Sequence, residues 1–138
     1  QRSNPGLTGA VRLDSSGWLT DVHHVLENAH YPSCSLTRDD VWFCVCLPEH
    51  LWLLPTRYSL MHGHGSASHA LRNWELLGSS DGQSWTVLRA HELDESLSGR
   101  FASCTWSVGQ SGPLRMFKVR MTGLNSTYRK DMRICGFE

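Results

Sequence analysis

The chain has 138 residues, a length that suits one domain and leaves little room for a second. Its 13 basic and 13 acidic residues give a net charge of zero, which argues against nucleic acid as the partner, because nucleic-acid binders present a basic surface. No apolar run approaches the roughly 20 residues that span a bilayer, and no signal-peptide pattern opens the sequence. We therefore expect a single domain over residues 1–138 with no membrane insertion.

The cysteines favour a reducing compartment. There are five of them at irregular spacing, whereas a secreted disulfide framework normally uses an even number. Cys44 and Cys46 share one face of an apolar run and are read as small buried hydrophobes, since the spacing of a zinc site is missing. The sequon "NST" at Asn125 would accept a glycan only in a secreted chain. We therefore expect an intracellular protein, cytoplasmic or nuclear, with no metal and no other cofactor.

The first third of the chain predicts two strands separated by an irregular stretch. Residues 9–16 alternate Val11 and Leu13 with polar residues, the pattern of a half-buried strand. The following "TDVHHVLENAH" predicts a turn or two of helix, with Thr20 or Asp21 as its cap. The run "VWFCVCLP" is apolar on both faces, which predicts a central strand of a sandwich.

The middle of the chain predicts a strand, a loop and a hairpin. A strand in "PTRYSLMHG" begins after Pro55, and "HGHGSASHA" is a loop rich in Gly, Ser and His. The stretch from Ala70 to Glu92 reads as two ribbons joined at Asp81-Gly82, a pair that favours tight two-residue connections. Its two tryptophans, Trp74 and Trp85, are interpreted as core anchors, because each indole buries a large area.

The last third predicts three further strands, in "FASCTWSV", "LRMFKVRMTG" and "MRICGFE". In the second of these, Phe117, Val119 and Met121 face inward. Short strands with turn signals and a single helical segment predict an all-β protein, an antiparallel β-sandwich.

The pieces "WFCVCL", "LPTRYSLMHG", "ALRNWELLGSSDGQSWTVLRAHELDES", "FASCTW" and "RMFKVRMTG" occur in the order found in discoidin domains. The chain resembles this family, the coagulation-factor C-type, galactose-binding-like domains, over residues 4–138. It is most similar to the intracellular branch found in BTB-domain proteins and in ubiquitin-ligase subunits such as Doc. The resemblance implies a jelly roll of about eight strands that recognises ligands with loops at one end and performs no catalysis.

Two departures from the secreted members of that family bear on the partner. Secreted members join an early cysteine to a late one, and Cys135 has no counterpart in the opening "QRSNPGLTG". The acidic cluster of calcium-dependent carbohydrate-binding relatives is also missing from the sequence. The missing cysteine partner favours the intracellular branch, in which the Doc subunit helps to hold degron peptides, and the missing acidic cluster argues against a calcium site.

Loops are where we expect ligand-binding residues, because exposed segments tolerate variation while the strands hold the core. The first candidate loop is 17–24, where Trp18 either tips a projecting spike or folds back to plug the base of the barrel. The second, 62–70, is a solvated loop, a binding loop or, with three imidazoles, a zinc site. The third, 125–131, is a solvated turn or a basic-aromatic tip that grips a carboxylate. The candidate ligand-binding residues are Trp18, His23, His24, His62, His64, His69, Tyr128, Arg129 and Lys130.

Enzyme signatures are missing from the sequence. No serine lies in a Gly-x-Ser-x-Gly elbow and no cysteine has a recognisable nucleophile context. Carboxylates such as Glu92, Asp94 and Glu95 are adjacent in sequence and are interpreted as solubilising charges. The sequence therefore predicts no catalytic residues. It predicts a module that binds a protein or peptide partner, including a ubiquitin-ligase substrate, with glycan or phospholipid-headgroup binding or an architectural role as alternatives.

Overall fold

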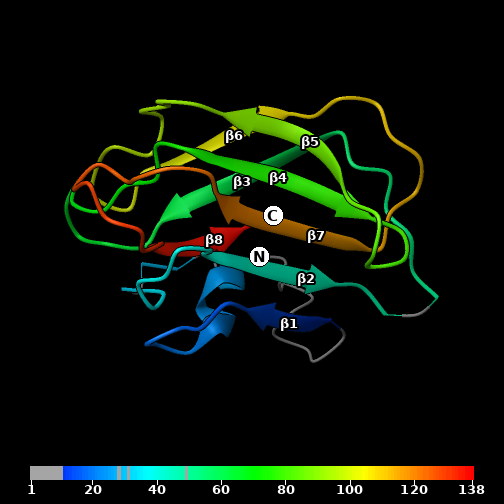
Figure 1. Ribbon diagram of the computed structural model, residues 1–138, viewed down its shortest axis with the longest axis horizontal. Helices are drawn as coiled ribbons and strands as arrows, with labels where there is room; N and C mark the ends of the chain where they lie inside the picture. The colour runs from blue at the N-terminus through cyan, green and yellow to red at the C-terminus, as the bar shows by residue number, and fades with distance from the viewer. Residues whose placement is uncertain (1–10, 28, 31, 49) are drawn as a thin grey trace.

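The computed structural model describes residues 11–138 except 28, 31 and 49. Two antiparallel β-sheets face each other in two layers, and a short 3-10 helix lies beside β8 and β1 (Figure 1). The elements are β1 (Arg12–Ser15), η2 (Val22–Leu26), β2 (Trp42–Cys46), β3 (Arg57–His62), β4 (Trp74–Ser79), β5 (Thr86–His91), β6 (Ser103–Ser107), β7 (Met116–Met121) and β8 (Ile134–Phe137).

The five-stranded sheet has the order β1-β2-β7-β4-β5, and the three-stranded sheet has the order β6-β3-β8. Strands that are neighbours in a sheet are often distant in sequence, as β2 and β7 are, which is typical of a jelly roll. The predicted all-β antiparallel sandwich of about eight strands is therefore confirmed. β2 lies between β1 and β7, as its two-faced apolar sequence predicted.

Alternation along each strand determines which side chains enter the core. On β7, Phe117 and Val119 point between the sheets, whereas Arg120 is exposed. Phe43 of β2 and Trp74 of β4 are fully buried, and Trp74 is the largest side chain in the core. One apolar cluster joins the two sheets, so the sandwich has a single core.

The 70–92 hairpin is confirmed, but its connection is longer than predicted. β4 and β5 pair antiparallel, and six residues, 80–85, separate them. The Asp81 carboxylate accepts hydrogen bonds from the backbone N–H groups of Gln83 and Ser84. The Asp81 side chain therefore stabilises a six-residue loop in place of a tight two-residue turn. The same hydrogen bonds lower the Asp81 pKa.

The prediction that Trp85 anchors the core is wrong. Its indole is half-buried on the outer face of the five-stranded sheet, where the Lys118 ammonium lies 4.3 Å from the ring centroid. The same ammonium lies 4.8 Å from the ring of Trp42, so Lys118 sits between two indoles. Trp85 therefore covers the sheet from outside through a cation–π contact.

The helix cap and the shared face of Cys44 and Cys46 agree with the sequence predictions. Asp21 caps η2 by accepting a hydrogen bond from the His23 backbone N–H, and Val25 and Leu26 are buried. None of the five cysteines, all of which lie in the described ranges, forms a disulfide bond. Cys44 and Cys46 have their sulfurs 3.9 Å apart on one face, and burial raises the pKa of Cys44 to about 12. No helix in the described ranges is long and apolar enough to cross a bilayer.

Candidate functional site

The three predicted binding segments lie at the same end of the sandwich, at the left of Figure 1. The His-rich loop and the 125–131 loop are joined directly, because Ala70 and Ser126 exchange backbone and hydroxyl hydrogen bonds of 2.9 Å. The backbone N–H of Ser35 donates to the Met132 carbonyl at 2.8 Å and ties the 32–41 segment to the same place. We call this surface, formed by 16–21, 32–41, 63–73 and 122–133, the loop end.

Asn125 organises the loop that carries the third group of candidates. Its amide nitrogen donates to the carbonyl and the carboxylate of Asp131, at 3.0 and 3.1 Å. Its amide oxygen accepts from the backbone N–H groups of Thr127 and Arg129, at 2.9 and 3.1 Å. Asn125 is buried, so the sequon has a structural use that leaves its amide inaccessible to a glycan.

Tyr128 projects from the tip of this loop. Its backbone has φ of 59°, a left-handed conformation that is uncommon for a tyrosine. The Asn125 bonds hold the chain in that turn, and the Tyr128 side chain is left 83% exposed. An aromatic ring presented in this way supplies contact area at a small cost in side-chain entropy.

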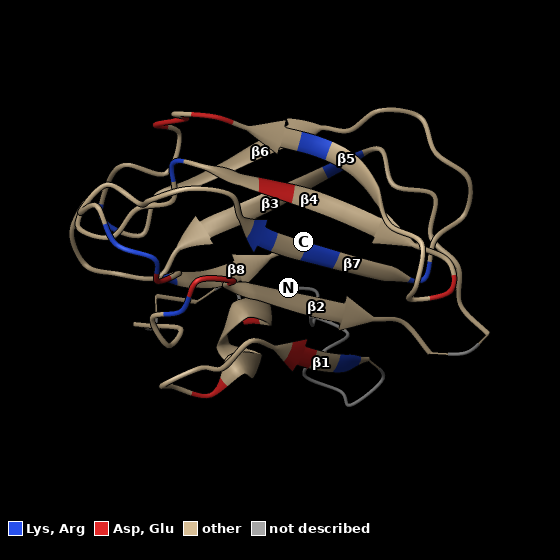
Figure 2. Cartoon of the chain, viewed as in Figure 1, with Lys and Arg blue, Asp and Glu red and all other residues tan. Residues whose placement is uncertain are grey.

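A charged groove lies between the 37–41 segment and residues 120–130. Two hollows of about 320 and about 510 Å³ share Arg38, Asp39 and Lys130, and together they form the charged groove. Its charged side chains are Arg38, Arg120, Arg129 and Lys130 on the basic side and Asp39, Asp40 and Glu75 on the acidic side. Figure 2 shows basic and acidic residues together at the left end of the sandwich.

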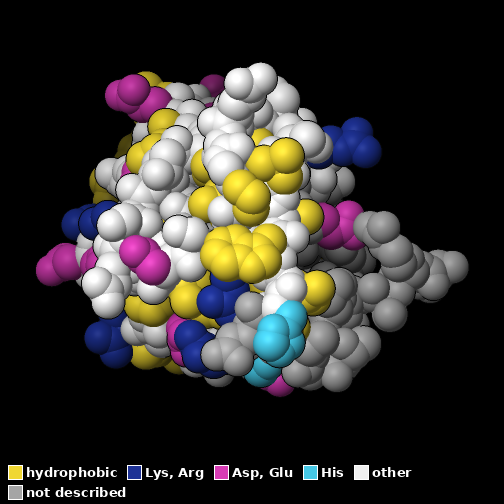
Figure 3. Space-filling view, turned by 90° about the vertical axis from the view of Figure 1, so that its right-hand side faces the viewer, with side chains coloured by type: hydrophobic (Ala, Val, Ile, Leu, Met, Phe, Trp, Pro, Cys, Tyr) yellow, Lys and Arg dark blue, Asp and Glu magenta, His cyan; other side chains and the backbone are white. Residues whose placement is uncertain are grey.

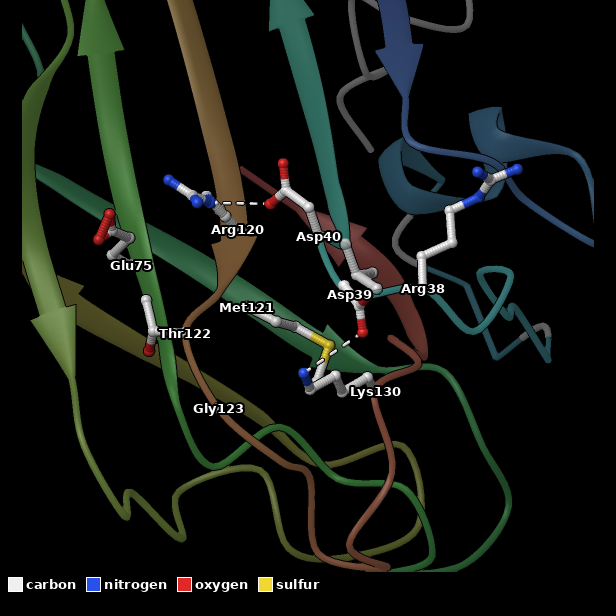
Figure 4. A pocket seen from close by; sticks show the side chains of 10 residues that line it. Arg38, Asp39, Asp40, Glu75, Arg120, Met121, Thr122, Gly123 and Lys130 are labelled. Carbon is white, nitrogen blue, oxygen red and sulfur yellow. Dashed lines mark hydrogen bonds and ion pairs between the residues drawn. The ribbon is translucent and has the colours of Figure 1, made fainter.

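Two ion pairs cross the groove (Figure 4). Arg120 Nε lies 2.9 Å from Asp40 Oδ1, and Lys130 Nζ lies 3.6 Å from Asp39 Oδ1. The Asp39 side chain is fully exposed, so its pair with Lys130 is held weakly. Lys130 is therefore available to a ligand carboxylate that replaces Asp39.

The histidines of the second loop do not form one site. His62 is buried at the end of β3, where its Nε2 bonds to the Ser66 carbonyl, so its assignment to an exposed binding loop is wrong. His64 is partly exposed and accepts hydrogen bonds from Ser66. His69 Nδ1 lies 3.1 Å from Asp131 Oδ1. Within the described part of the chain no group of three ligands is arranged to hold a metal ion.

The residues after β1 lie away from the charged groove. Trp18 folds back: its indole N–H donates to Ser33 Oγ at 3.0 Å, and the ring meets Phe43 edge-on at 6.0 Å. His23 is exposed and pairs with Asp21 at 3.0 Å, and His24 is half-buried in η2. Of the first group of candidates, none lines the groove.

The Asp131 carboxylate separates the Cys34 thiol from the His69 imidazole, an arrangement that does not support nucleophilic catalysis. Cys34 Sγ lies 3.7 Å from Asp131 Oδ2, and His69 bonds the other oxygen. A nucleophile needs the imidazole next to the thiol so that it can accept the proton. Burial also raises the pKa of Cys34, which disfavours the thiolate.

Asp131 itself is an ionised structural group. Burial alone would raise its pKa, but the hydrogen bonds from His69 and Asn125 and the nearby Arg133 together lower it. The negative charge therefore lies beneath the 125–131 loop, where it aligns the Asn125 amide and so the loop whose tip is Tyr128.

Comparison with solved structures identifies the fold. The carbohydrate-binding module CpGH89CBM32-5 of Clostridium perfringens, solved with GalNAc-β-1,3-galactose, superposes with a TM-score of 0.70 at 10% identity, over 94% of both chains. The CBM32 of AlyQ, solved with 4,5-unsaturated mannuronic acid, gives 0.71 at 11% identity over 91% of both chains. The lectin domain of lectinolysin, solved with Lewis B antigen, gives 0.71 at 9% identity, over 92% of this chain and 89% of that one. The chain therefore has the discoidin-like, galactose-binding-like fold.

Sequence comparison places relatives of this discoidin-like domain inside much larger proteins. It is 34% identical, over 98% of its length, to part of the E3 ubiquitin-protein ligase Ufd4 of Drosophila melanogaster, and 32% identical, over 99%, to part of the E3 ubiquitin-protein ligase hecd-1 of Caenorhabditis elegans. A BTB/POZ domain-containing protein of Arabidopsis thaliana is 36% identical over 59% of the chain. The domain spans only 5% of each ligase. No protein-family model matches it.

Proposed function

We propose that this discoidin-like domain is a non-catalytic recognition module of a large intracellular protein of the ubiquitin-ligase type. In this proposal the charged groove binds a segment of a protein or peptide partner, in the cytoplasm or the nucleus. Support comes from two directions: the sequence relatives include two E3 ubiquitin-protein ligases, and the solved neighbours are binding modules. A partner held in the groove would be presented to the ligase as a substrate.

The observation that carries the proposal is that the basic side chains around the groove have few carboxylate partners within the described ranges. Within the described ranges, no carboxylate lies at ion-pair distance from Arg38 or Arg129, and Lys130 pairs only with the fully exposed Asp39. A ligand carboxylate can therefore bind these cations without breaking a buried pair.

The groove also offers apolar contact beside the charges. Tyr128 and Leu124, both exposed, line the same hollow as Arg129 and Lys130. A peptide with an acidic residue next to an aromatic or aliphatic residue matches both features. We therefore expect the groove to prefer acidic peptide segments with one apolar anchor.

Binding can be tested by fluorescence anisotropy with a library of labelled acidic peptides that differ in the apolar residue. Peptides that bind are expected to lose at least tenfold in affinity to the double variant Arg129→Ala, Lys130→Ala, and to bind more weakly as salt rises. Arg12→Ala is the matched control, because Arg12 is an exposed cation on β1, outside the groove. Unchanged affinity in the double variant would remove the groove as the site.

Glycan binding is the second candidate, and Tyr128 is the observation that favours it. An exposed ring next to Lys130 and Arg129 can stack on a sugar while the cations bind an acidic substituent. One solved neighbour was determined with a mannuronic acid. A glycan array that includes uronic acids separates the candidates: binding to a sugar that is lost in Tyr128→Ala supports this function, and an array with no signal excludes it.

A further inference from the structure

The opposite end of the sandwich carries an exposed apolar surface. Between β2 and β3 the strip Leu51, Trp52, Leu53 and Leu54 has exposed fractions of 54, 53, 50 and 59%. Figure 3 looks onto this end and shows hydrophobic side chains gathered at its centre with basic side chains beside them. Half the surface of each of these side chains, roughly 100 Å² apiece, makes about 400 Å² of apolar area, which is within the roughly 300–600 Å² of the largest apolar patch on a typical monomer, a patch that is often functional.

The strip is held in place by its backbone. Leu53 and Leu114 exchange two backbone hydrogen bonds of 2.8 Å, which pair the strip with the segment before β7. The Leu47 N–H donates to the Arg115 carbonyl at 2.8 Å and fixes the start of the same connection. The apolar side chains are therefore presented outward on an ordered scaffold, so little conformational entropy is lost when something binds them.

A hollow next to the strip can accept one apolar side chain. It has a volume of about 150 Å³, and its lining includes Leu53 of the strip together with Val45, Phe117 and Phe137 from between the sheets. Glu138 also lines it. Apolar walls that reach the core make the hollow a pocket for a side chain of about leucine or phenylalanine size.

Arg115 adds a polar feature to this surface. Its guanidinium carbon lies 5.6 Å from the centroid of the Trp52 ring, and its Nε is buried without a hydrogen-bond acceptor among the described residues. The positive charge of this guanidinium beside the strip favours a partner that brings a carboxylate. The complementary surface is therefore apolar with one carboxylate.

We propose that this surface docks onto a neighbouring domain of the same polypeptide. This inference rests on the proposed function, in which the domain is one part of a ligase-type protein. The domain amounts to 5% of the length of each ligase that it resembles, so a protein of that type has ample further chain to cover the strip. About 400 Å² is half of the roughly 800 Å² that each partner buries in a stable complex of separate proteins. It suits an intramolecular contact, because a tether supplies a high effective concentration and domain interfaces within one chain are smaller. Docking at this end leaves the charged groove, at the other end, facing outward.

The test compares hydroxyl-radical labelling of Trp52 in the full-length polypeptide and in the separate 138-residue chain. We expect labelling of Trp52 to fall at least fivefold in the full-length protein. The full-length variant Leu54→Asp is expected to restore it, because a carboxylate cannot enter an apolar contact. Val87→Asp, at another half-exposed apolar position, is the matched control and should leave the protection unchanged.

Three results would overturn the proposal. Equal labelling of Trp52 in both proteins means that no domain of the polypeptide covers the strip. Protection in the separate chain that grows with its concentration identifies a second copy as the occupant. Protection of the full-length protein that appears only when another protein is added identifies a separate partner.

Discussion

The imidazole of His91 stacks on the indole of Trp74 inside the sandwich, with ring centroids 4.0 Å apart and planes 11° from parallel. His91 Nδ1 donates to Asp94 Oδ2 at 2.8 Å, which leaves Nε2 to accept the hydroxyl proton of Tyr58. The Tyr58 oxygen in turn accepts the indole N–H of Trp74 at 3.0 Å. Four side chains from three strands and a loop thus satisfy one another's hydrogen bonds in the core, which fixes the neutral tautomer of His91.

Replacing His91 by phenylalanine tests this network. His91→Phe keeps a ring against Trp74 but leaves the Tyr58 hydroxyl without its acceptor and removes the imidazole donor to Asp94 Oδ2. We expect the free energy of unfolding to fall by about 2 kcal/mol, the cost of stranding buried polar groups. Urea denaturation measures it, with the surface change Val87→Ala expected to stay within about 0.5 kcal/mol. A His91→Phe protein as stable as the parent would contradict the role given to the network.

Buried imidazoles also predict how stability depends on pH. Burial lowers the pKa of both His62 and His91, although the Asp94 carboxylate works against the shift at His91. Since the unfolded chain has imidazoles of pKa about 6.5, it binds protons that the folded chain does not. The stabilising contribution is complete above pH 6.5 and is lost as the pH falls below it, by at most about 1.4 kcal/mol per pH unit for each histidine.

Urea midpoints at pH 7.5, 6.5 and 5.5 check this prediction, and the His91→Phe protein should show a shallower dependence. A stability that increases as the pH falls through 6.5 would show that these imidazoles are protonated in the folded state, and would overturn the assignment of a neutral His91.

The two tryptophans of the β4–β5 hairpin should differ in their contribution to stability. Trp74 is fully buried and touches His91 and Trp106, so Trp74→Ala is expected to cost about 3–5 kcal/mol. Trp85 is half-buried and contacts Lys118 from outside, so Trp85→Ala is expected to cost about 1 kcal/mol. Thermal or urea unfolding of the two variants measures the difference, and equal losses would place Trp85 in the core after all.

Sequence patterns predicted the strands because alternation and strand length are local properties. Val11 and Leu13 faced inward as expected, and the two-faced run around Phe43 became an interior strand. The face on which Trp85 packs depends on Lys118, which lies on β7 and comes beside it only through the jelly-roll topology. No local pattern contains that information, so the indole was assigned to the core.

The functional surfaces show the same limit. The composition of the Tyr128–Lys130 segment is local, so the sequence offers a basic-aromatic tip as one of two alternatives beside a solvated turn, and the structure shows that the segment lines the groove. The position of Asp39 opposite Lys130 arises from the packing of two distant loops, so no local sequence pattern predicts it. The apolar residues from Leu51 to Leu54 lie next to a predicted strand, where sequence alone does not distinguish them from core residues, and only the fold reveals that they are exposed.

The loop that presents Tyr128 should depend on the amide of Asn125. Asn125→Ala removes two donated and two accepted hydrogen bonds at a buried position, and we expect a loss of about 2 kcal/mol in the free energy of unfolding. Asn125→Asp has nearly the same shape and keeps the acceptor oxygen. Its second oxygen takes the place of the amide nitrogen, which lies 3.1 Å from Asp131 Oδ1, so two carboxylates are brought together.

At neutral pH we therefore expect Asn125→Asp to be less stable than Asn125→Ala, because like charges at this distance repel in a buried setting. Protonation of one carboxyl relieves the repulsion, so the gap between the two variants should close as the pH is lowered toward 4. Parallel urea titrations of both variants measure the gap. Asn125→Asp as stable as the parent at pH 7 would show that the amide N–H groups do not hold the loop, and that another contact places Tyr128 at the rim of the groove.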